Sequence, residues 1–186
     1  MDEIRIGLIG AAGCGSTTIA TNISNEFGLT MLNSRDFTRD ILKRDGYDYL
    51  SFVERFLAEK EREFELVEKR IRTEHQYNSF ITDRTTLEHY VYAIDSFDKY
   101  SIEDLSILCE RCKNNMSNYT HLFYLPVSEV LQNNNLRTLN VYYQKNIDYM
   151  INGIINEWKL NVVKLTGNVE DNITFISNLI KNDYSK

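Results

Sequence analysis

Near its N-terminus the chain reads Gly10-Ala11-Ala12-Gly13-Cys14-Gly15-Ser16-Thr17-Thr18, between an apolar run at residues 4–9 and the stretch Ile19-Ala20-Thr21-Asn22-Ile23. A strand, a glycine-rich loop and a helix in this order are typical of a phosphate-binding loop. The glycines let the backbone turn tightly and point several N–H groups at one anion, and the helix adds its positive dipole end. The stretch therefore predicts a phosphate site made by Gly10, Ala12, Gly13, Cys14, Gly15, Ser16, Thr17 and Thr18.

One position departs from the usual pattern of such loops, G-x-x-x-x-G-K-[ST], because Ser16 stands where the lysine belongs. Serine can donate a hydrogen bond, but it brings no positive charge to the β- and γ-phosphates of a nucleotide. Loss of one preorganised stabilising group typically lowers a rate by about 100- to 1,000-fold. We therefore expect phosphate binding here, and efficient catalysis only if another cation replaces the lysine. The candidates for that cation are Lys43, Arg137 and Lys145.

The overall composition limits the classes of function. A length of 186 residues suits one domain, spanning residues 1–186, with a sizeable core. The formal net charge is −6 and no basic block is present, which disfavours nucleic acid as a partner unless a basic groove forms on folding. The N-terminus is acidic and no apolar stretch approaches the ~20 residues that span a bilayer, so no signal peptide and no membrane contact are expected. We expect a cytoplasmic monomer or homodimer.

The three cysteines do not form a disulfide framework. Cys109 and Cys112 have the spacing of a zinc or redox site, but they lie in a predicted helix without a second cysteine or histidine pair nearby. A buried or half-buried structural role is therefore favoured for both. Cys14 lies in the glycine-rich loop, where nearby solvent and a helix N-terminus would lower the pKa of its thiol and raise its reactivity.

Strands and helices are expected to alternate along the whole chain. Apolar runs predict strands at residues 4–9, 29–33, 79–83, 120–125 and 161–165. Helical periodicity and capping residues predict helices at 16–26, 35–44 (capped by Ser34), 50–75, 86–95, 101–115, 141–158 and 169–182. Residues 127–140 are polar and predict a mobile loop. The sequence thus indicates an α/β fold, with a parallel sheet, helices on both of its faces and right-handed crossovers.

Ligands bind such a sheet beyond the carboxyl ends of its strands, and polar side chains follow several of the predicted strands. Thr17 and Asp83 are expected to hold Mg²⁺, because hydroxyl and carboxylate oxygens suit this hard cation. Arg39 and Arg84 would grip the phosphate of an acceptor, since a guanidinium binds phosphate bidentately. Arg137 would swing in with its loop to bridge the transferred group while the closing loop excludes water.

These motifs resemble the nucleoside and nucleoside-monophosphate kinases of the P-loop class, especially the small deoxynucleotide-kinase and ribosylnicotinamide-kinase-like proteins of phages and bacteria. The resemblance spans nearly the whole chain. It implies a five-stranded parallel sheet in the order 2-3-1-4-5, with ATP and Mg²⁺ as requirements. It also implies an acceptor-binding helical region at about 34–76 and a lid at about 127–145. It assigns acceptor binding to Arg35, Asp36, Arg39 and Arg84, catalysis to Asp83, Arg84 and Arg137, and contact with the donor adenine to Gly167 and Asn168.

The favoured hypothesis is ATP-dependent phosphoryl transfer to a small nucleotide, first a deoxynucleoside monophosphate that becomes a diphosphate. One alternative is a kinase that acts on a hydroxyl of DNA or of a modified base. Another is a nucleotide-binding module without catalysis, because the loop lysine is absent at Ser16.

Overall fold

The structure is a computed structural model that describes residues 3–46, 60–127 and 141–184. Its centre is a five-stranded sheet in the order β2-β3-β1-β4-β5, and every neighbouring pair is parallel. The strands are β1 (Arg5–Ile9), β2 (Thr30–Leu32), β3 (Phe80–Thr82), β4 (His121–Tyr124) and β5 (Val163–Lys164). The predicted strand positions and the predicted strand order are both confirmed.

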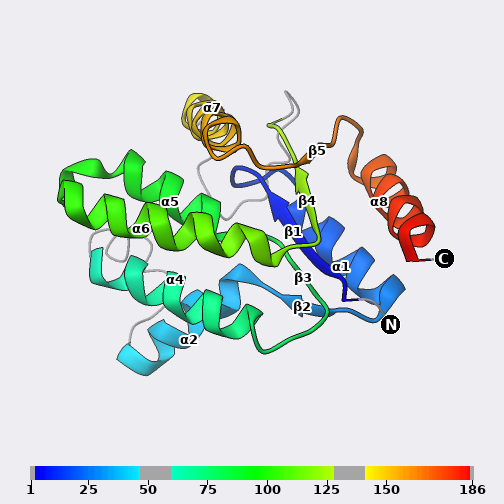
Figure 1. Ribbon diagram of the computed structural model, residues 1–186, viewed down its shortest axis with the longest axis horizontal. Coiled ribbons are helices and arrows are strands. Elements are labelled where there is room, and N and C mark those ends of the chain that lie inside the picture. Colours follow the sequence, from blue (N-terminus) through cyan, green and yellow to red (C-terminus); the bar gives the residue numbers. More distant parts are fainter. Residues whose placement is uncertain (1–2, 47–59, 128–140, 185–186) are drawn as a thin grey trace.

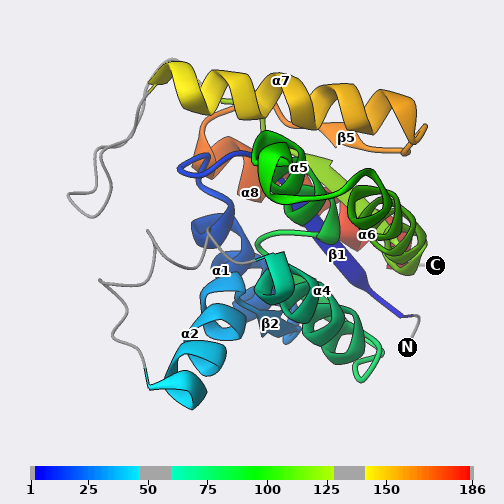
Figure 2. The ribbon, with the colours of Figure 1, turned by 90° about the vertical axis from the view of Figure 1, so that its left-hand side faces the viewer.

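Helices cover both faces of this sheet (Figures 1 and 2). Figure 1 shows α1 and α8 on one side, and α4, α5, α6 and α7 around the other. The helices are α1 (Ser16–Phe27), α2 (Ser34–Asp45), α4 (Lys60–Glu74), α5 (Thr86–Asp95), α6 (Ile102–Asn115), α7 (Val141–Glu157) and α8 (Val169–Tyr184). Short 3-10 turns at Phe97–Lys99 and Met116–Asn118 flank α6.

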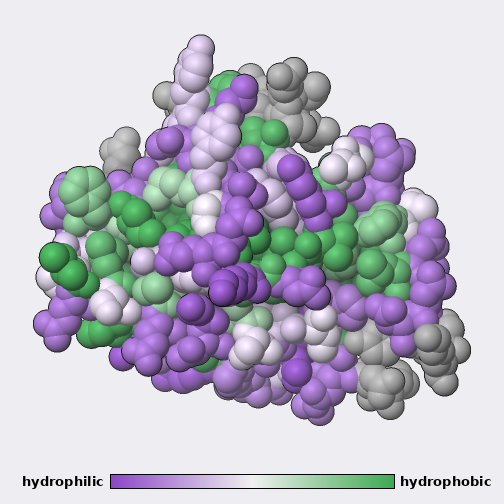
Figure 3. All heavy atoms as spheres, turned by 45° about the horizontal axis from the view of Figure 1, so that its top comes forward, coloured by the Kyte–Doolittle hydropathy of each residue, from purple (hydrophilic) through white to green (hydrophobic). Residues whose placement is uncertain are grey.

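Two hydrophobic clusters hold the helices on the sheet. On one face, Ile6 and Leu8 of β1 pack with Ile19 and Ile23 of α1 and Ile176 of α8. The second and larger cluster contains buried residues of α2, α4, α5, α6 and α7. Burial of apolar surface on both faces explains the near-continuous apolar sequences of the central strands. In Figure 3 hydrophilic residues make up most of the surface in view, and hydrophobic residues show through between them.

Local signals set most of the helix ends. Gly28 ends α1 in a left-handed conformation (φ 64°), which costs glycine little. Capping boxes begin α5 at Thr85 with Glu88 and α6 at Ser101 with Asp104. The prediction that Ser34 caps α2 is wrong. The Asn33 side chain accepts from the Arg35 N–H instead (2.9 Å), because the Ser34 side chain is turned toward Asp83.

Some predicted features lie outside the described residues. They are the first part of the helix expected at 50–75, the polar loop at 127–140 apart from Val127 at its start, and Arg137 within it. The last residues of the expected lid form the first turn of α7. Among the described helices, none is both long and apolar enough to cross a membrane.

Candidate active site

The glycine-rich loop lies at the carboxyl end of β1, in the middle of the sheet. Gly13 (φ 89°) and Gly15 (φ 91°) adopt left-handed conformations, which a residue with a side chain rarely tolerates. A side chain at Gly10 would meet Cys14 Sγ at 2.7 Å and the Leu125 carbonyl at 2.8 Å. The loop then enters α1 directly at Ser16. Its backbone N–H groups and the helix N-terminus therefore meet at one point, as anion binding requires.

A hydrogen-bonded chain joins this loop to the ends of β2 and β3. Thr17 Oγ1 donates to Asp83 Oδ2 (2.8 Å), and Asp83 Oδ1 accepts from the Ser34 N–H (2.8 Å) and the Ser34 hydroxyl (2.7 Å). The Asp83 side chain is thus fixed by its neighbours and is 4% exposed. A hydroxyl and a carboxylate oxygen in direct contact fit Mg²⁺, which commonly takes one or two protein oxygens and completes its shell with phosphates and water.

Arg70 of α4 is a central residue that sequence reasoning missed, and its side chain is 1% exposed. It joins Ser34 and the end of β3 to α5. Its guanidinium donates to the Ser34 hydroxyl (2.8 Å), Thr82 Oγ1 (2.8 Å), the Arg84 carbonyl (2.7 Å), His89 Nε2 (3.2 Å) and Glu74 Oε1 (3.3 Å). Because these partners occupy its donors, Arg70 orders the strand ends instead of offering a free cation. Its place in a charged amphipathic helix gave no sign of this role.

Two buried side chains tie the helices to the glycine-rich loop. Glu88 of α5 (1% exposed) accepts from the Gly10 N–H at 3.0 Å and from the N–H of Thr85 at 3.0 Å. Gln144 of α7 (3% exposed) donates through Nε2 to the Ala12 carbonyl. Sequence reasoning missed both contacts. The spacing of Thr85 and Glu88 does signal a capping box, but not the contact with the loop.

Arg84 follows Asp83 and lies beside the loop, as the alternation of strands and loops predicts. Its guanidinium is half-buried over the Tyr92 ring (5.6 Å to the centroid) and donates to the Tyr92 hydroxyl at 3.3 Å. Burial acts to lower the pKa of Arg84, but Tyr92 and Glu88 outweigh it and the pKa is raised. Arg84 therefore keeps its positive charge next to the loop.

The loop after β5 packs against the glycine-rich loop. A side chain at Gly15 would meet Val169 Cγ2 at 3.0 Å, so the start of α8 touches the start of α1. Asn172 Nδ2 donates to the Gly167 carbonyl (2.9 Å) and its Oδ1 accepts from the Gly167 N–H (3.2 Å). The Asn168 side chain accepts from the Asp171 N–H at 2.9 Å. The predicted adenine loop is thus held by its own hydrogen bonds and lies next to the phosphate loop.

Other predicted residues are not gathered at this point. Asp36 and Arg39 form an exposed ion pair with each other at 3.4 Å on α2, and Arg35 beside them is exposed. Lys43 and Lys145, two candidates for the missing charge, are exposed on α2 and α7. Because Arg39 is exposed and paired with Asp36, while Arg84 is half-buried over Tyr92, the described residues do not show the predicted two-arginine grip on a phosphate.

The prediction for Cys14 is wrong. The side chain is half-buried and packs with the hydrophobic cluster under α1. Burial raises the pKa of its thiol, although hydrogen bonds with Ser16 and the charge of Arg84 act in the opposite direction. Cys14 is therefore a packing residue of the loop and not a reactive thiol. Cys112 is buried and Cys109 half-buried, as predicted for structural residues.

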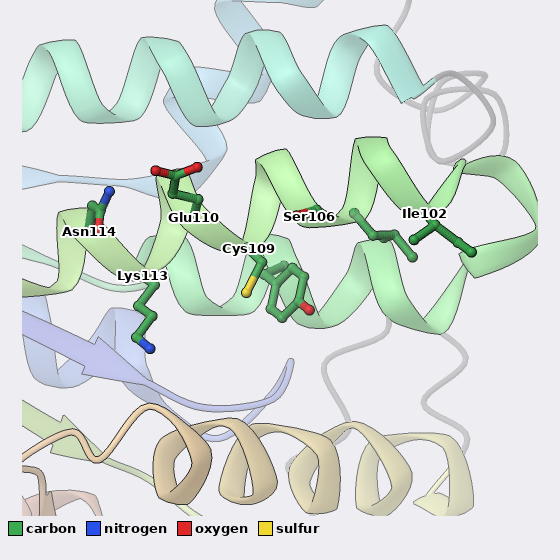
Figure 4. Close-up of a pocket in the computed structure, with 8 residues that line it drawn as sticks. Ile102, Ser106, Cys109, Glu110, Lys113 and Asn114 are labelled. Atoms are coloured by element: carbon green, nitrogen blue, oxygen red, sulfur yellow. The ribbon is translucent and has the colours of Figure 1, made fainter.

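Neither a surface groove on α6 nor a cluster of metal ligands offers a second candidate site in the described part of the chain. A surface groove is lined by α6 residues and Tyr90, and Figure 4 shows Cys109 and Lys113 on one side of α6 and Glu110 on the other. The groove contains none of the polar groups at the strand ends. Within residues 3–46, 60–127 and 141–184, no three His, Cys, Asp or Glu side chains cluster as metal ligands. The strand ends therefore remain the candidate site.

Known proteins share this arrangement. A family described as an AAA domain matches residues 5–172. The deoxyadenosine kinase from M. mycoides, with products dCMP and dCDP bound, has a TM-score of 0.65 at 15% identity, over 96% of this chain and 99% of that one. NadR protein in complex with NAD and AMP-PNP has a TM-score of 0.69 at 10% identity, over 97% of this chain and 49% of that one. The shikimate kinase from Acinetobacter baumannii has a TM-score of 0.57 at 14% identity, over 98% and 96%.

No curated protein matches the sequence. The three structures named above are at most 15% identical in sequence to this chain. Their similarity therefore establishes the fold alone. The family match extends over the glycine-rich loop, all five strands and the strand-end residues. The chain therefore belongs to the AAA domain family, and it has the P-loop fold of the deoxyadenosine kinase, NadR and shikimate kinase structures.

Proposed function

We propose that this protein transfers the terminal phosphate of ATP to a small nucleotide acceptor, with a deoxynucleoside monophosphate as the first candidate. The contact between Thr17 Oγ1 and Asp83 Oδ2 (2.8 Å) carries the proposal. In it a hydroxyl of the glycine-rich loop meets a buried carboxylate at the neighbouring strand end, and these are oxygens that suit Mg²⁺. A glycine-rich turn that only packed a helix on a strand would have no need of this pair.

In the proposed reaction the protein acts mainly through position and charge, as phosphoryl transfer requires. The N–H groups of the loop and the N-terminus of α1 would bind the donor phosphates. Thr17 and Asp83 would hold Mg²⁺, which when bound neutralises charge on the phosphates. Ser34 and Arg70 keep Asp83 oriented, because Ser34 donates twice to its Oδ1 and Arg70 donates to Ser34. Gly167 and Asn168 would border the adenine.

The acceptor would lie between α2 and the strand ends. Asp36 at the first turn of α2 would orient its reacting oxygen, and Arg35 and Arg39 would meet its phosphate. For that role the exposed Asp36–Arg39 pair must open, which costs little because exposed ion pairs contribute about 0–1 kcal/mol. The M. mycoides deoxyadenosine kinase supports deoxynucleosides and their phosphates as the chemical class of the acceptor, but its name and its product dCMP point to an acceptor without a phosphate.

A second candidate acceptor is a nucleoside without a phosphate. The observation that favours it is that the two arginines lie in different surroundings. Arg39 is exposed on α2, whereas Arg84 is half-buried over Tyr92 beside the loop. An acceptor without a phosphate needs no grip from both arginines.

The test is transfer from γ-labelled ATP with Mg²⁺ to a panel of deoxynucleosides, their monophosphates and single-stranded DNA. Labelled diphosphate from a monophosphate supports the first candidate, and labelled monophosphate from a nucleoside supports the second. Labelled DNA would favour the kinase of a DNA hydroxyl or a modified base. ATP binding without transfer to any acceptor would overturn the proposal and favour a nucleotide-binding module.

A further inference from the structure

The glycine-rich loop raises a question that the family match leaves open. Ser16 begins α1 at the position of the missing lysine, so the loop itself has no positive side chain for the donor phosphates. The lysines considered from the sequence, Lys43 and Lys145, are exposed on α2 and α7. Arg137, the third candidate, lies outside the described residues. Among the described residues, a replacement is sought in a side chain that the fold fixes beside the loop.

Arg84 is fixed in this way because its neighbours on both sides contact the loop. One residue before it, Asp83 accepts from Thr17 Oγ1 at 2.8 Å. One helical turn after it, Glu88 accepts from the Gly10 N–H at 3.0 Å. Its own carbonyl accepts from Arg70 at 2.7 Å. The backbone that carries Arg84 is therefore attached to both ends of the phosphate loop and to α4.

The side chain of Arg84 has donors to spare. It donates to the neutral Tyr92 hydroxyl at 3.3 Å and lies over the same ring. Its electrostatic effect reaches the loop, where the charge of Arg84 opposes the burial that raises the pKa of the Cys14 thiol. A guanidinium has five N–H donors, so the contact with Tyr92 leaves others for phosphate oxygens.

A competing interpretation makes Arg84 only the counter-ion of Glu88. The Glu88 carboxylate, however, already accepts from the Gly10 N–H, the Thr85 N–H and the Thr85 hydroxyl (2.7 Å). Burial raises the pKa of Glu88, whereas the charge of Arg84 and then these three donors favour its ionised form, so Arg84 also serves Glu88 without being its only support. The two interpretations differ in what happens when a lysine is put back at residue 16.

We propose that Arg84 supplies the donor phosphates with the positive charge that the loop lacks at Ser16. The inference rests on the proposed function, because it assumes that the loop binds ATP. It assigns Arg84 to the β- and γ-phosphates of the donor, in addition to any contact with the acceptor. A loop lysine and Arg84 would then be interchangeable sources of one charge.

The experiment measures the affinities for ATP and AMP by titration calorimetry, without an acceptor. The variants are Arg84→Gln, Arg84→Lys, Ser16→Lys and the double variant Ser16→Lys/Arg84→Gln. The matched control is Arg72→Gln, which removes an exposed arginine of α4 remote in sequence from the loop. Thermal unfolding of each variant verifies that the fold is intact.

We expect Arg84→Gln to bind ATP about 10- to 100-fold more weakly, since hydrogen bonds to charged groups are the strong ones, and to bind AMP within about threefold of the unaltered chain. The double variant should regain most of the ATP affinity, and Arg84→Lys and Arg72→Gln should lose little. If Arg84→Gln does not fold, Ser16→Lys alone decides. If Ser16→Lys binds ATP less than about threefold more tightly than the unaltered chain, the site already holds its cation and the inference is supported. A gain of about tenfold or more contradicts the inference.

Two results would overturn the inference and leave the proposed function standing. They are ATP binding that is indifferent to Arg84→Gln, and a loss that Ser16→Lys does not restore. Absence of ATP binding by the unaltered chain would overturn the proposed function and the inference together.

Discussion

The contact between Gln144 and the phosphate loop predicts how substitutions of Gln144 change the affinity for ATP. Gln144 is 3% exposed, its Nε2 donates to the Ala12 carbonyl, and its Oε1 has no hydrogen-bond partner among the described residues. The amide cannot be turned over without placing two oxygens together. Gln144 thus acts as a positioning residue that holds one peptide of the loop from α7.

Two substitutions separate the hydrogen bond from the packing. Gln144→Leu removes the donor and keeps the volume, which costs about 1 kcal/mol for a neutral bond. Ala12 is half-buried, so water can reach its carbonyl and the cost stays near this value. We expect the affinity for ATP to fall about 3- to 10-fold. Gln144→Glu restores the donor only when the new carboxyl is protonated.

The sign of the pH dependence follows from burial. A carboxyl buried beside a carbonyl has a raised pKa. The free-energy cost of ionising it at this place is therefore absent below the ordinary pKa of about 4.3, and it weakens ATP binding as the pH rises through the raised value. Each unit of that rise costs about 1.4 kcal/mol. The Gln144→Glu variant should therefore bind ATP nearly as well as the unaltered chain at pH 5, and at least about tenfold more weakly at pH 8.

The assay is titration with a fluorescent ATP analogue at several pH values between 5 and 8. The unaltered chain and Gln144→Leu are measured at each pH, because ATP and the rest of the protein titrate as well. A Gln144→Glu profile that runs parallel to that of Gln144→Leu would refute the positioning role of the Gln144 hydrogen bond, since the variant would then act through packing alone.

Three further predictions follow from the buried groups of the site. Asp83→Asn removes the carboxylate that Thr17 contacts; phosphate transfer should fall at least about 100-fold, and the affinity for ATP should no longer respond to Mg²⁺ or a chelator. Arg70→Met leaves Glu74 (0% exposed) without its buried cation, so urea denaturation should show a loss of about 3–5 kcal/mol. Because burial raises the pKa of the Cys14 thiol above its ordinary value, its alkylation should be slow at pH 8 and accelerate only at higher pH.

Each of these has an outcome that contradicts it. ATP binding by Asp83→Asn that still depends on Mg²⁺ would place the metal elsewhere. An Arg70→Met protein as stable as the unaltered chain would mean that Glu74 is satisfied by Asn115 and Tyr119, which donate to it at 2.7 Å and 2.8 Å. Mass spectrometry that finds Cys14 alkylated at pH 7 as fast as a free thiol would show that the loop is open to solvent.

Local sequence signals were sufficient for the elements and for a parallel sheet with helices on both faces, whereas the strand order followed from the resemblance to P-loop kinases. The glycine-rich loop fixes a strand before it and a helix after it, and apolar runs that alternate with amphipathic ones leave few arrangements open to a parallel sheet with right-handed crossovers. Capping boxes fixed the starts of α5 and α6. Ser34 was assigned wrongly because its hydroxyl has a long-range partner, Asp83, which competes with the local cap.

The candidate site was only partly predictable for the same reason. Thr17, Asp83 and Arg84 follow from their places at strand ends, where the fold brings such residues together. Arg70 and Gln144 lie on helices whose charged and polar residues resemble ordinary solvated ones. Their burial depends on contacts with residues far away in the chain, and Cys14 likewise became a packing residue through neighbours that its own motif does not specify.

The most direct test of the account is a comparison of phosphate transfer by the unaltered chain and by Asp83→Asn, with γ-labelled ATP, Mg²⁺ and a mixture of nucleosides and nucleoside monophosphates. The account predicts a labelled nucleotide product from the unaltered chain, despite Ser16, and a loss of at least about 100-fold in the variant. Equal transfer by both proteins, or ATP binding without transfer by either one, would contradict it.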